Sequence, residues 1–313
     1  MARVLSTSEG THRGAFGPGE WAAFGAIGLI WGSSFLLIAV GLEAFEPGLV
    51  TWLRVVAGAA VLALVPGGRL PIAREDRPRL VALSVLWVAV PFTLFPLAQQ
   101  HVNSAVAGML NGGLPILAAL IGSIMLRRLP TRPHMVGLSL GSGGVATIAI
   151  SAATEGGGET LGVLMLLAAI LCYGVAINVA TPLQQRYGSV PVMARMLALA
   201  AVWTAPFGLV SIRASHSSWT SLAAVIVLGA VGTGFAFVLM GRLVGRVGAT
   251  RAAFAIYLVP VVAMVLGARV HDEDVATVGI VGIAMVITGA LLASRPDRQG
   301  REPGHEAARA PLV

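Results

Sequence analysis

The chain has 313 residues, of which 56% are hydrophobic and only 11% are charged. Soluble domains carry about 25% charged residues, so this composition excludes an ordinary soluble globule. The net charge of +7 could suggest nucleic-acid binding, but the arginines lie in short loops between apolar stretches, where they indicate membrane topology. The single cysteine, Cys172, excludes an internal disulfide and any multi-cysteine metal motif.

Ten apolar stretches follow one another along the chain, each close to the roughly 17–25 residues that a membrane helix needs. They cover residues 21–41, 47–66, 78–98, 105–126, 134–152, 161–181, 190–212, 221–241, 248–268 and 275–293. These stretches have almost no polar face that could meet water, so they are unlike the helices of a soluble core. The sequence therefore predicts an all-α integral membrane protein with ten transmembrane helices.

The charged residues predict how these helices are oriented. When the connections are taken alternately, 17 arginines fall on one side of the membrane. The other side holds only Arg213 and Arg269, together with seven acidic residues. Loops that stay in the cytoplasm are rich in Lys and Arg. We therefore expect a multi-pass protein of the inner (cytoplasmic) cell membrane with both termini in the cytoplasm.

The fourth apolar stretch returns later in the chain with its flanking charge reversed. Residues 107–128 and 252–273 align when Pro115 is matched with Pro260, an offset of 145 residues. Two arginines that end the first copy then correspond to two acidic residues in the second. Such a reversal is typical of inverted-repeat transporters. The predicted organisation is an N-terminal tail (1–20), a five-helix repeat (21–152), an inverted five-helix repeat (161–293) and a C-terminal tail (294–313).

The first two stretches carry a recognisable motif. Trp31-Gly32-Ser33-Ser34-Phe35, followed by Pro47 and Arg54, resembles the opening of EamA-type transporters of the drug/metabolite transporter (DMT) superfamily. The resemblance covers about residues 21–293. It implies a carrier, in most members an exporter of amino acids or other small metabolites. It also implies a central cavity lined by spans 1, 3, 4, 6, 8 and 9.

Arg54 is the most informative polar residue within the apolar stretches. It lies seven residues after Pro47, about 10 Å along the helix, at a depth where an arginine costs about 2.5–3.5 kcal/mol. One interpretation is a contact with a substrate carboxylate or phosphate, which the guanidinium group suits. The other is snorkelling to a lipid headgroup or capping of helix carbonyls. The same alternatives apply to Arg195, and span 2 is not expected to line the cavity.

The remaining cavity candidates are polar, aromatic or helix-breaking residues within the spans. They are Trp31, Ser34, Trp87, Phe95, Asn111, Gly112, Pro115, Tyr173, Asn178, Tyr257 and Pro260. Asn111, Gly112 and Pro115 share one helical face, where a substrate could approach the backbone. Close packing of helices is the alternative for the small and aromatic residues, and an interhelical hydrogen bond is the alternative for Asn178.

The function predicted from these features is transport of small metabolites, such as amino acids or related amphipathic compounds, with export by alternating access. Alternatives are a nucleotide-sugar-like or drug carrier and, with less support, an intramembrane enzyme, for which no catalytic pair is evident. No Asp or Glu lies in the middle of a span, which favours facilitated transport or exchange over proton coupling. We expect a small-molecule substrate and the lipid bilayer as partners, with a homodimer left open. We expect no cofactor, metal or nucleic acid.

Overall fold

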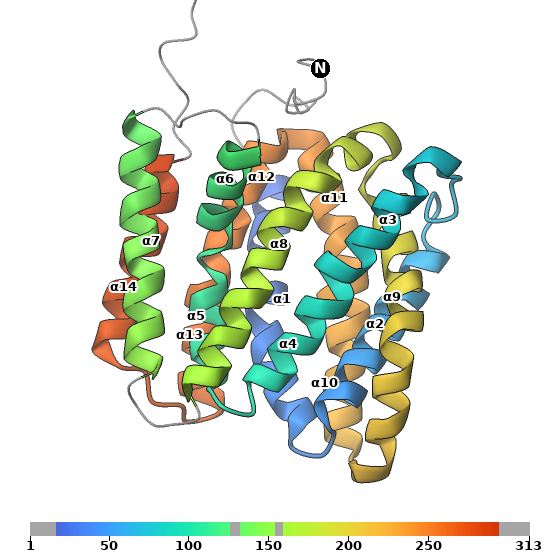
Figure 1. Ribbon diagram of the computed structural model, residues 1–313, viewed down its shortest axis with the longest axis horizontal. Coiled ribbons are helices and arrows are strands. Elements are labelled where there is room, and N and C mark those ends of the chain that lie inside the picture. Colours follow the sequence, from blue (N-terminus) through green and yellow to red (C-terminus); the bar gives the residue numbers. More distant parts are fainter. Residues whose placement is uncertain (1–16, 126–131, 154–158, 294–313) are drawn as a thin grey trace, which may run out of the picture.

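The computed structural model describes residues 17–125, 132–153 and 159–293. All regular secondary structure within these ranges is helical (Figure 1). Most of the two predicted tails, residues 1–16 and 294–313, lies outside the described residues, as does the pair Arg127–Arg128.

The helices follow one another with short connections, and several join end to end into longer runs. They are α1 (Pro18–Leu42), α2 (Pro47–Leu64), η2 (Arg74–Asp76), α3 (Arg77–Leu83), η3 (Ser84–Ala89), α4 (Val90–Ala98), α5 (Ser104–Asn111), α6 (Leu114–Met125), α7 (Arg132–Ala153), α8 (Glu159–Tyr187), α9 (Ser189–Ser211), η4 (Ile212–Ala214), α10 (Trp219–Gly229), η5 (Ala230–Phe235), α11 (Ala236–Val247), α12 (Ala249–Ala253), η6 (Phe254–Leu258), α13 (Val259–Val270) and α14 (Thr277–Ala293). In the described part of the chain, nine runs are long and apolar enough to cross a membrane. The tenth predicted span corresponds to α14, whose apolar part, Thr277–Gly289, is shorter.

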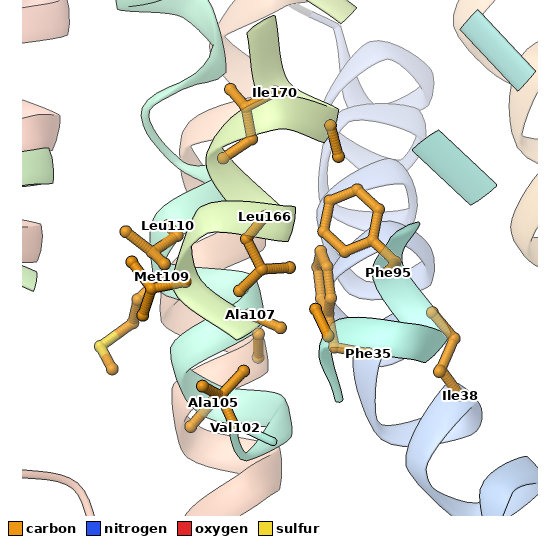
Figure 2. Packing of buried hydrophobic residues seen from close by; sticks show 14 of the residues in the cluster. Phe35, Ile38, Phe95, Val102, Ala105, Ala107, Met109, Leu110, Leu166 and Ile170 are labelled. Atoms are coloured by element: carbon orange, nitrogen blue, oxygen red, sulfur yellow. The ribbon is translucent and has the colours of Figure 1, made fainter. Parts of the chain in front are cut away.

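The helices form one bundle around α1, which packs against α13, α10, α5 and α11. At one edge of the bundle α7 and α14 lie side by side, and at the other edge α2 packs along α9 (Figure 1). Buried apolar side chains from α1, α4, α5 and α8 meet in the largest cluster, where Phe35 and Phe95 face Ala107 and Leu166 (Figure 2). Small residues bring backbones together, because a Cβ at Gly108 would overlap Ala263.

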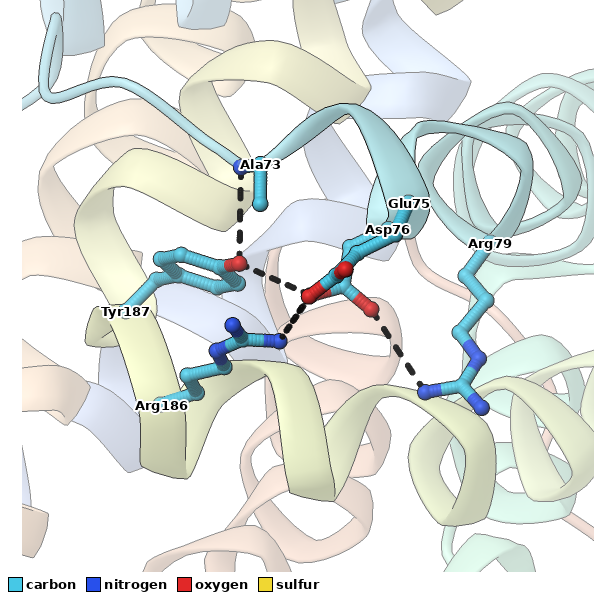
Figure 3. A network of polar contacts seen from close by, with 6 residues as sticks. All are labelled: Ala73, Glu75, Asp76, Arg79, Arg186 and Tyr187. Atoms are coloured by element: carbon cyan, nitrogen blue, oxygen red, sulfur yellow. Dashed lines mark hydrogen bonds and ion pairs between the residues drawn. The ribbon is translucent and has the colours of Figure 1, made fainter.

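The connections between the long helical runs lie at two opposite ends of the bundle (Figure 1). At the first, here called the basic-loop end, the segment around η2 meets the last turn of α8. Arg186 donates to Asp76 at 2.8 Å and to Glu75 at 2.9 Å, and the Tyr187 hydroxyl donates to Asp76 at 2.8 Å (Figure 3). Arg195 donates to the carbonyl of Arg69 at 3.0 Å. These contacts join segments that are more than 100 residues apart in sequence.

The opposite end, here called the acidic-loop end, holds the connections before α2, α5, α10 and α14. Glu273 accepts hydrogen bonds from the backbone N–H groups of Ser104 at 2.9 Å and Ala105 at 2.8 Å, and so caps the N-terminus of α5. His271 Nε2 lies 3.3 Å from a carboxylate oxygen of Glu43. The loop after α13 is thereby joined to α5 and to the end of α1.

Helix irregularities recur at matching places in the two halves of the chain. The π-helical segments η3 and η5 begin 146 residues apart, at Ser84 and Ala230. Likewise α5 ends at Asn111, four residues before Pro115, and the 3-10 segment η6 ends at Leu258, two residues before Pro260. The two prolines are 145 residues apart. A π turn places one additional residue in a helix, and such turns are frequent at functional sites.

Candidate central cavity

A cavity of about 130 Å³ lies inside the bundle between the two halves of the chain. Its walls come from α1, α2, η3, α4, α5, α6, α8, η5, α11, η6 and α13. The lining residues are Trp31, Ser34, Phe35, Ile38, Arg54, Trp87, Phe92, Phe95, Asn111, Leu114, Tyr173, Ile177, Gly232, Phe237, Ile256 and Val259. These belong to the six spans implied by the resemblance and, in addition, to span 2 through Arg54. Most of the wall is apolar, with a few polar groups that could orient a ligand.

Arg54 is the one charged residue among the described residues of the lining, and it is only 7% exposed. Its guanidinium carbon lies 3.8 Å from the centre of the Phe92 ring, and its Nε donates to the hydroxyl of Thr233 at 3.1 Å. Among the described residues no carboxylate pairs with it. A buried charge is costly unless it is paired, so the N–H groups at the end of this side chain are suited to an anionic group of a ligand.

This geometry separates the two arginines for which the sequence left the same alternatives open. Arg54 points into the protein, so it does not snorkel to a headgroup, and its Nε donates to a hydroxyl and not to a helix carbonyl. Arg195 instead donates to the carbonyls of Arg69 and Leu70 at the basic-loop end.

Asn111 contributes a second polar group to the lining. The side-chain oxygen of Asn111 is buried and accepts no hydrogen bond within the described part of the chain. It can accept from an ammonium, hydroxyl or amide group of a ligand. Ser34, by contrast, donates to the carbonyl of Ile30 at 3.0 Å.

Aromatic rings form much of the remaining wall. The ring of Phe237 makes edge-to-face contacts with Trp31 and with Trp87, at centroid distances of 5.9 Å and 6.4 Å. Phe95 stacks on Tyr173 with centroids 5.9 Å apart. Such a wall offers a large apolar surface to a ligand side chain.

The cavity brings together seven of the twelve residues predicted from the sequence. They are Trp31, Ser34, Arg54, Trp87, Phe95, Asn111 and Tyr173. Helical periodicity could also have found three more lining residues, because each lies four residues after a predicted one. They are Phe35 after Trp31, Ile38 after Ser34 and Ile177 after Tyr173. No sequence signal indicated Gly232 or Phe237.

Five predicted residues lie outside the cavity lining. A Cβ at Gly112 would lie 3.0 Å from Pro260, so these two residues mark a close contact between the end of α5 and α13. Pro115 lies three residues after Gly112, at the start of α6. Tyr257 packs against Phe254 with ring centroids 5.7 Å apart.

Asn178 is the fifth of these residues, and it joins two helices by hydrogen bonds. Its amide nitrogen donates to the carbonyl of Ala118 on α6 at 2.9 Å and to that of Gly174 on its own helix at 2.8 Å. Gly122 leaves the room that the amide oxygen occupies, since a Cβ there would lie 2.7 Å from it.

Comparisons with known proteins agree on one class. The model of the EamA-like transporter family matches residues 18–150 and 160–295. A protein of Streptantibioticus cattleyicolor named "probable terminal-alkyne amino-acid exporter" is 25% identical over 85% of this chain and 90% of its own length. The uncharacterized transporter YoaV of Bacillus subtilis is 26% identical over 85% of this chain and 94% of its own. These names indicate transporters.

A solved crystal structure of another protein has the same fold. It superposes with a TM-score of 0.60 at 22% identity and covers 88% of this chain and 96% of its own. At this identity the likeness concerns the fold alone.

Proposed function

The chain belongs to the EamA-like transporter family, and from this membership we propose that it exports amino acids or related amphipathic metabolites. The observation that carries the choice of substrate is the buried Arg54, which lines the cavity without a carboxylate partner among the described residues. A substrate carboxylate would supply the missing charge. The free oxygen of Asn111 would accept from the substrate's ammonium group, and the aromatic wall would contact its side chain.

Two further facts favour amino acids over the alternative cargoes. A nucleotide sugar carries a diphosphate, and a single arginine in the lining is few basic groups for two phosphates. One relative is named as an amino-acid exporter, which supports both the cargo and the direction proposed for this chain.

We further propose that the protein crosses the inner membrane ten times, as two inverted five-helix units with both termini in the cytoplasm. The alternating direction of the long helical runs supports this, as do the helix irregularities that recur 145–146 residues apart (Figure 1). The 17 residues of α14 measure about 25 Å along the helix, and α14 packs against α7. The gathering of basic loops at one end supports a cytoplasmic location for that end.

In this arrangement the two units would rock about the cavity and open it to either side in turn. The lining residues that the structure describes include no carboxylate, which supports facilitated transport or exchange without proton coupling. Liposomes that contain the protein and equal substrate on both sides should show no net movement when a pH gradient is imposed. Uphill movement that follows the pH gradient would contradict this mode of transport.

The test of the substrate proposal is flux of radiolabelled L-leucine and L-phenylalanine in proteoliposomes. We expect saturable flux with the wild-type protein and, with Arg54→Gln, a loss of about tenfold or more in apparent affinity, because a charge-assisted hydrogen bond is lost. Arg54→Lys keeps the charge and should retain part of the affinity. Arg195→Gln is the matched control, since this arginine bonds to loop carbonyls away from the cavity.

Two results would overturn the proposal. The first is that the wild-type protein transports none of the standard amino acids. The second is flux through Arg54→Gln that equals that of the wild type at every substrate concentration.

A further inference from the structure

Thr233 is the only described residue whose side chain makes a hydrogen bond to Arg54, and its side chain is fully buried. The hydroxyl donates its own proton to the carbonyl of Leu228 at 3.2 Å. Because the proton is used there, the oxygen offers lone pairs to the Nε–H of Arg54, which lies 3.1 Å away. The hydroxyl can therefore act only as an acceptor towards the arginine.

The π-helical segment η5 gives Thr233 this position. Five other threonines donate to the carbonyl four residues earlier, as expected in an α-helix. They are Thr51, Thr93, Thr147, Thr181 and Thr204. Thr233 instead reaches the carbonyl five residues earlier, which is the register of a π turn. One additional residue rotates the next part of the helix by about 100° around its axis, so the π turn sets which side chains face α2.

Glycines bring the π segment close to α2 at this level. A Cβ on Gly229 would lie 2.5 Å from the backbone oxygen of Arg54 and 3.0 Å from its Cα. A Cβ on Gly58 would lie 3.0 Å from the methyl group of Thr233. The two helices therefore meet with little space between backbones, and the short threonine side chain reaches Arg54 directly.

We infer that Thr233 is a positioning residue that determines how Arg54 presents its guanidinium group to the substrate. This inference rests on the proposed function. Thr233 occupies Nε, and the Phe92 ring lies 3.8 Å from the guanidinium carbon, so one edge and one face of the group are held. The two terminal nitrogens are left for the cavity. A carboxylate then binds end-on to both of them, and the side-on mode that uses Nε is closed.

This geometry makes Thr233 a determinant of carboxylate recognition without contact to the substrate. A carboxylate matches the spacing of the two terminal nitrogens and gains two parallel hydrogen bonds. An amine without a carboxylate gains nothing from the arrangement. The contribution of Thr233 should therefore appear for amino acids and be absent for the corresponding decarboxylated amines.

The experiment compares variants that differ by the hydroxyl group alone. Thr233→Val keeps the shape of the side chain and removes the hydroxyl, and Thr233→Ala and Thr233→Ser form a second pair of smaller side chains. The matched control is Thr204→Val, which removes a buried hydroxyl outside the cavity whose one hydrogen bond within the described part of the chain is to the carbonyl four residues earlier. Each variant is reconstituted at equal protein content, and the apparent KM and maximal rate for L-leucine are measured.

We expect Thr233→Val and Thr233→Ala to raise the apparent KM by about tenfold or more, with the maximal rate within about twofold, because Arg54 is no longer held in the orientation in which it forms charge-assisted hydrogen bonds with the substrate carboxylate. Thr233→Ser should stay within about threefold of the wild type, and Thr204→Val should be unchanged. Inhibition of leucine flux by isopentylamine, which is leucine without its carboxylate, should be the same in all variants.

The outcomes separate this inference from the proposed function. Wild-type flux together with an unchanged KM in Thr233→Val and Thr233→Ala overturns the role of Thr233 and leaves the proposed function standing. A loss in Thr233→Ser as large as that in Thr233→Ala overturns it as well, since the hydroxyl would then not matter. In an Arg54→Gln background, Thr233→Val should add no further loss, because the two residues act as a unit. Absence of wild-type amino-acid flux overturns both proposals.

Discussion

Glu273→Gln should destabilise the protein by weakening the contact between α13 and the start of α5. The carboxylate of Glu273 accepts two backbone hydrogen bonds, at 2.9 Å and 2.8 Å, from the first turn of α5. An amide can accept only through its single oxygen and carries no charge to balance the helix N-terminus. The loss of one charge-assisted hydrogen bond, worth about 1.5–3 kcal/mol, makes a cost of about 2 kcal/mol a reasonable expectation for this half-buried group. A helix-terminus charge adds about 0.3–1 kcal/mol.

The measurement is thermal unfolding in detergent, followed by circular dichroism at 222 nm. A loss of about 2 kcal/mol should lower the apparent midpoint by about 3 °C in a chain of 313 residues. The control is Asp274→Asn, which removes a neighbouring negative charge from an exposed side chain in the same loop. An equal shift in both variants, or no shift in Glu273→Gln, would refute the assignment of a structural role to this carboxylate.

Three other changes test different parts of the structure. Asn178→Leu removes two hydrogen bonds and crowds α6, so it should lower stability by about 1–2 kcal/mol in the same unfolding assay, while the apparent KM of the folded protein stays unchanged. Phe237→Ala removes two aromatic contacts of the cavity wall and should raise the apparent KM for L-phenylalanine about fivefold. The increase should be smaller for L-alanine, and equal increases for both substrates would contradict a contact with the substrate side chain. In a Cys172→Ser background, cysteines placed at Glu75 and at Asp274 should react with a membrane-impermeant maleimide from opposite faces of the membrane, and labelling from the same face would contradict the proposed topology.

The positions of the long helices followed from hydrophobicity alone. Each predicted span overlaps a helical run, because a chain with so few charged residues offers little choice of where membrane segments begin and end. The π and 3-10 segments were not predicted. Their hydrogen-bond register depends on packing against neighbouring helices, as at Gly229 and Arg54, and no local sequence pattern encodes it.

Residue type and helical register together explain which cavity residues were found. Arg54 and Asn111 stood out because polar groups are rare within apolar stretches, and both line the cavity. Phe237 lies two residues after the end of the π segment, so its direction could not be read from regular helical periodicity. For Gly112 and Pro260 the sequence left a cavity wall and close helix packing as alternatives, and the structure uses their small or compact shapes to bring α5 and α13 together.

The edge-to-face contacts of Phe237 also provide an optical probe of the cavity. Two of the six tryptophans, Trp31 and Trp87, contact this ring and line the space where a cargo molecule would sit, whereas the other four lie outside the lining. Indole emission depends on local polarity, so the entry of a molecule between these rings changes the fluorescence of the unlabelled protein. Occupancy can thus be titrated in solution without a label or a radioactive ligand, even before the natural cargo is identified.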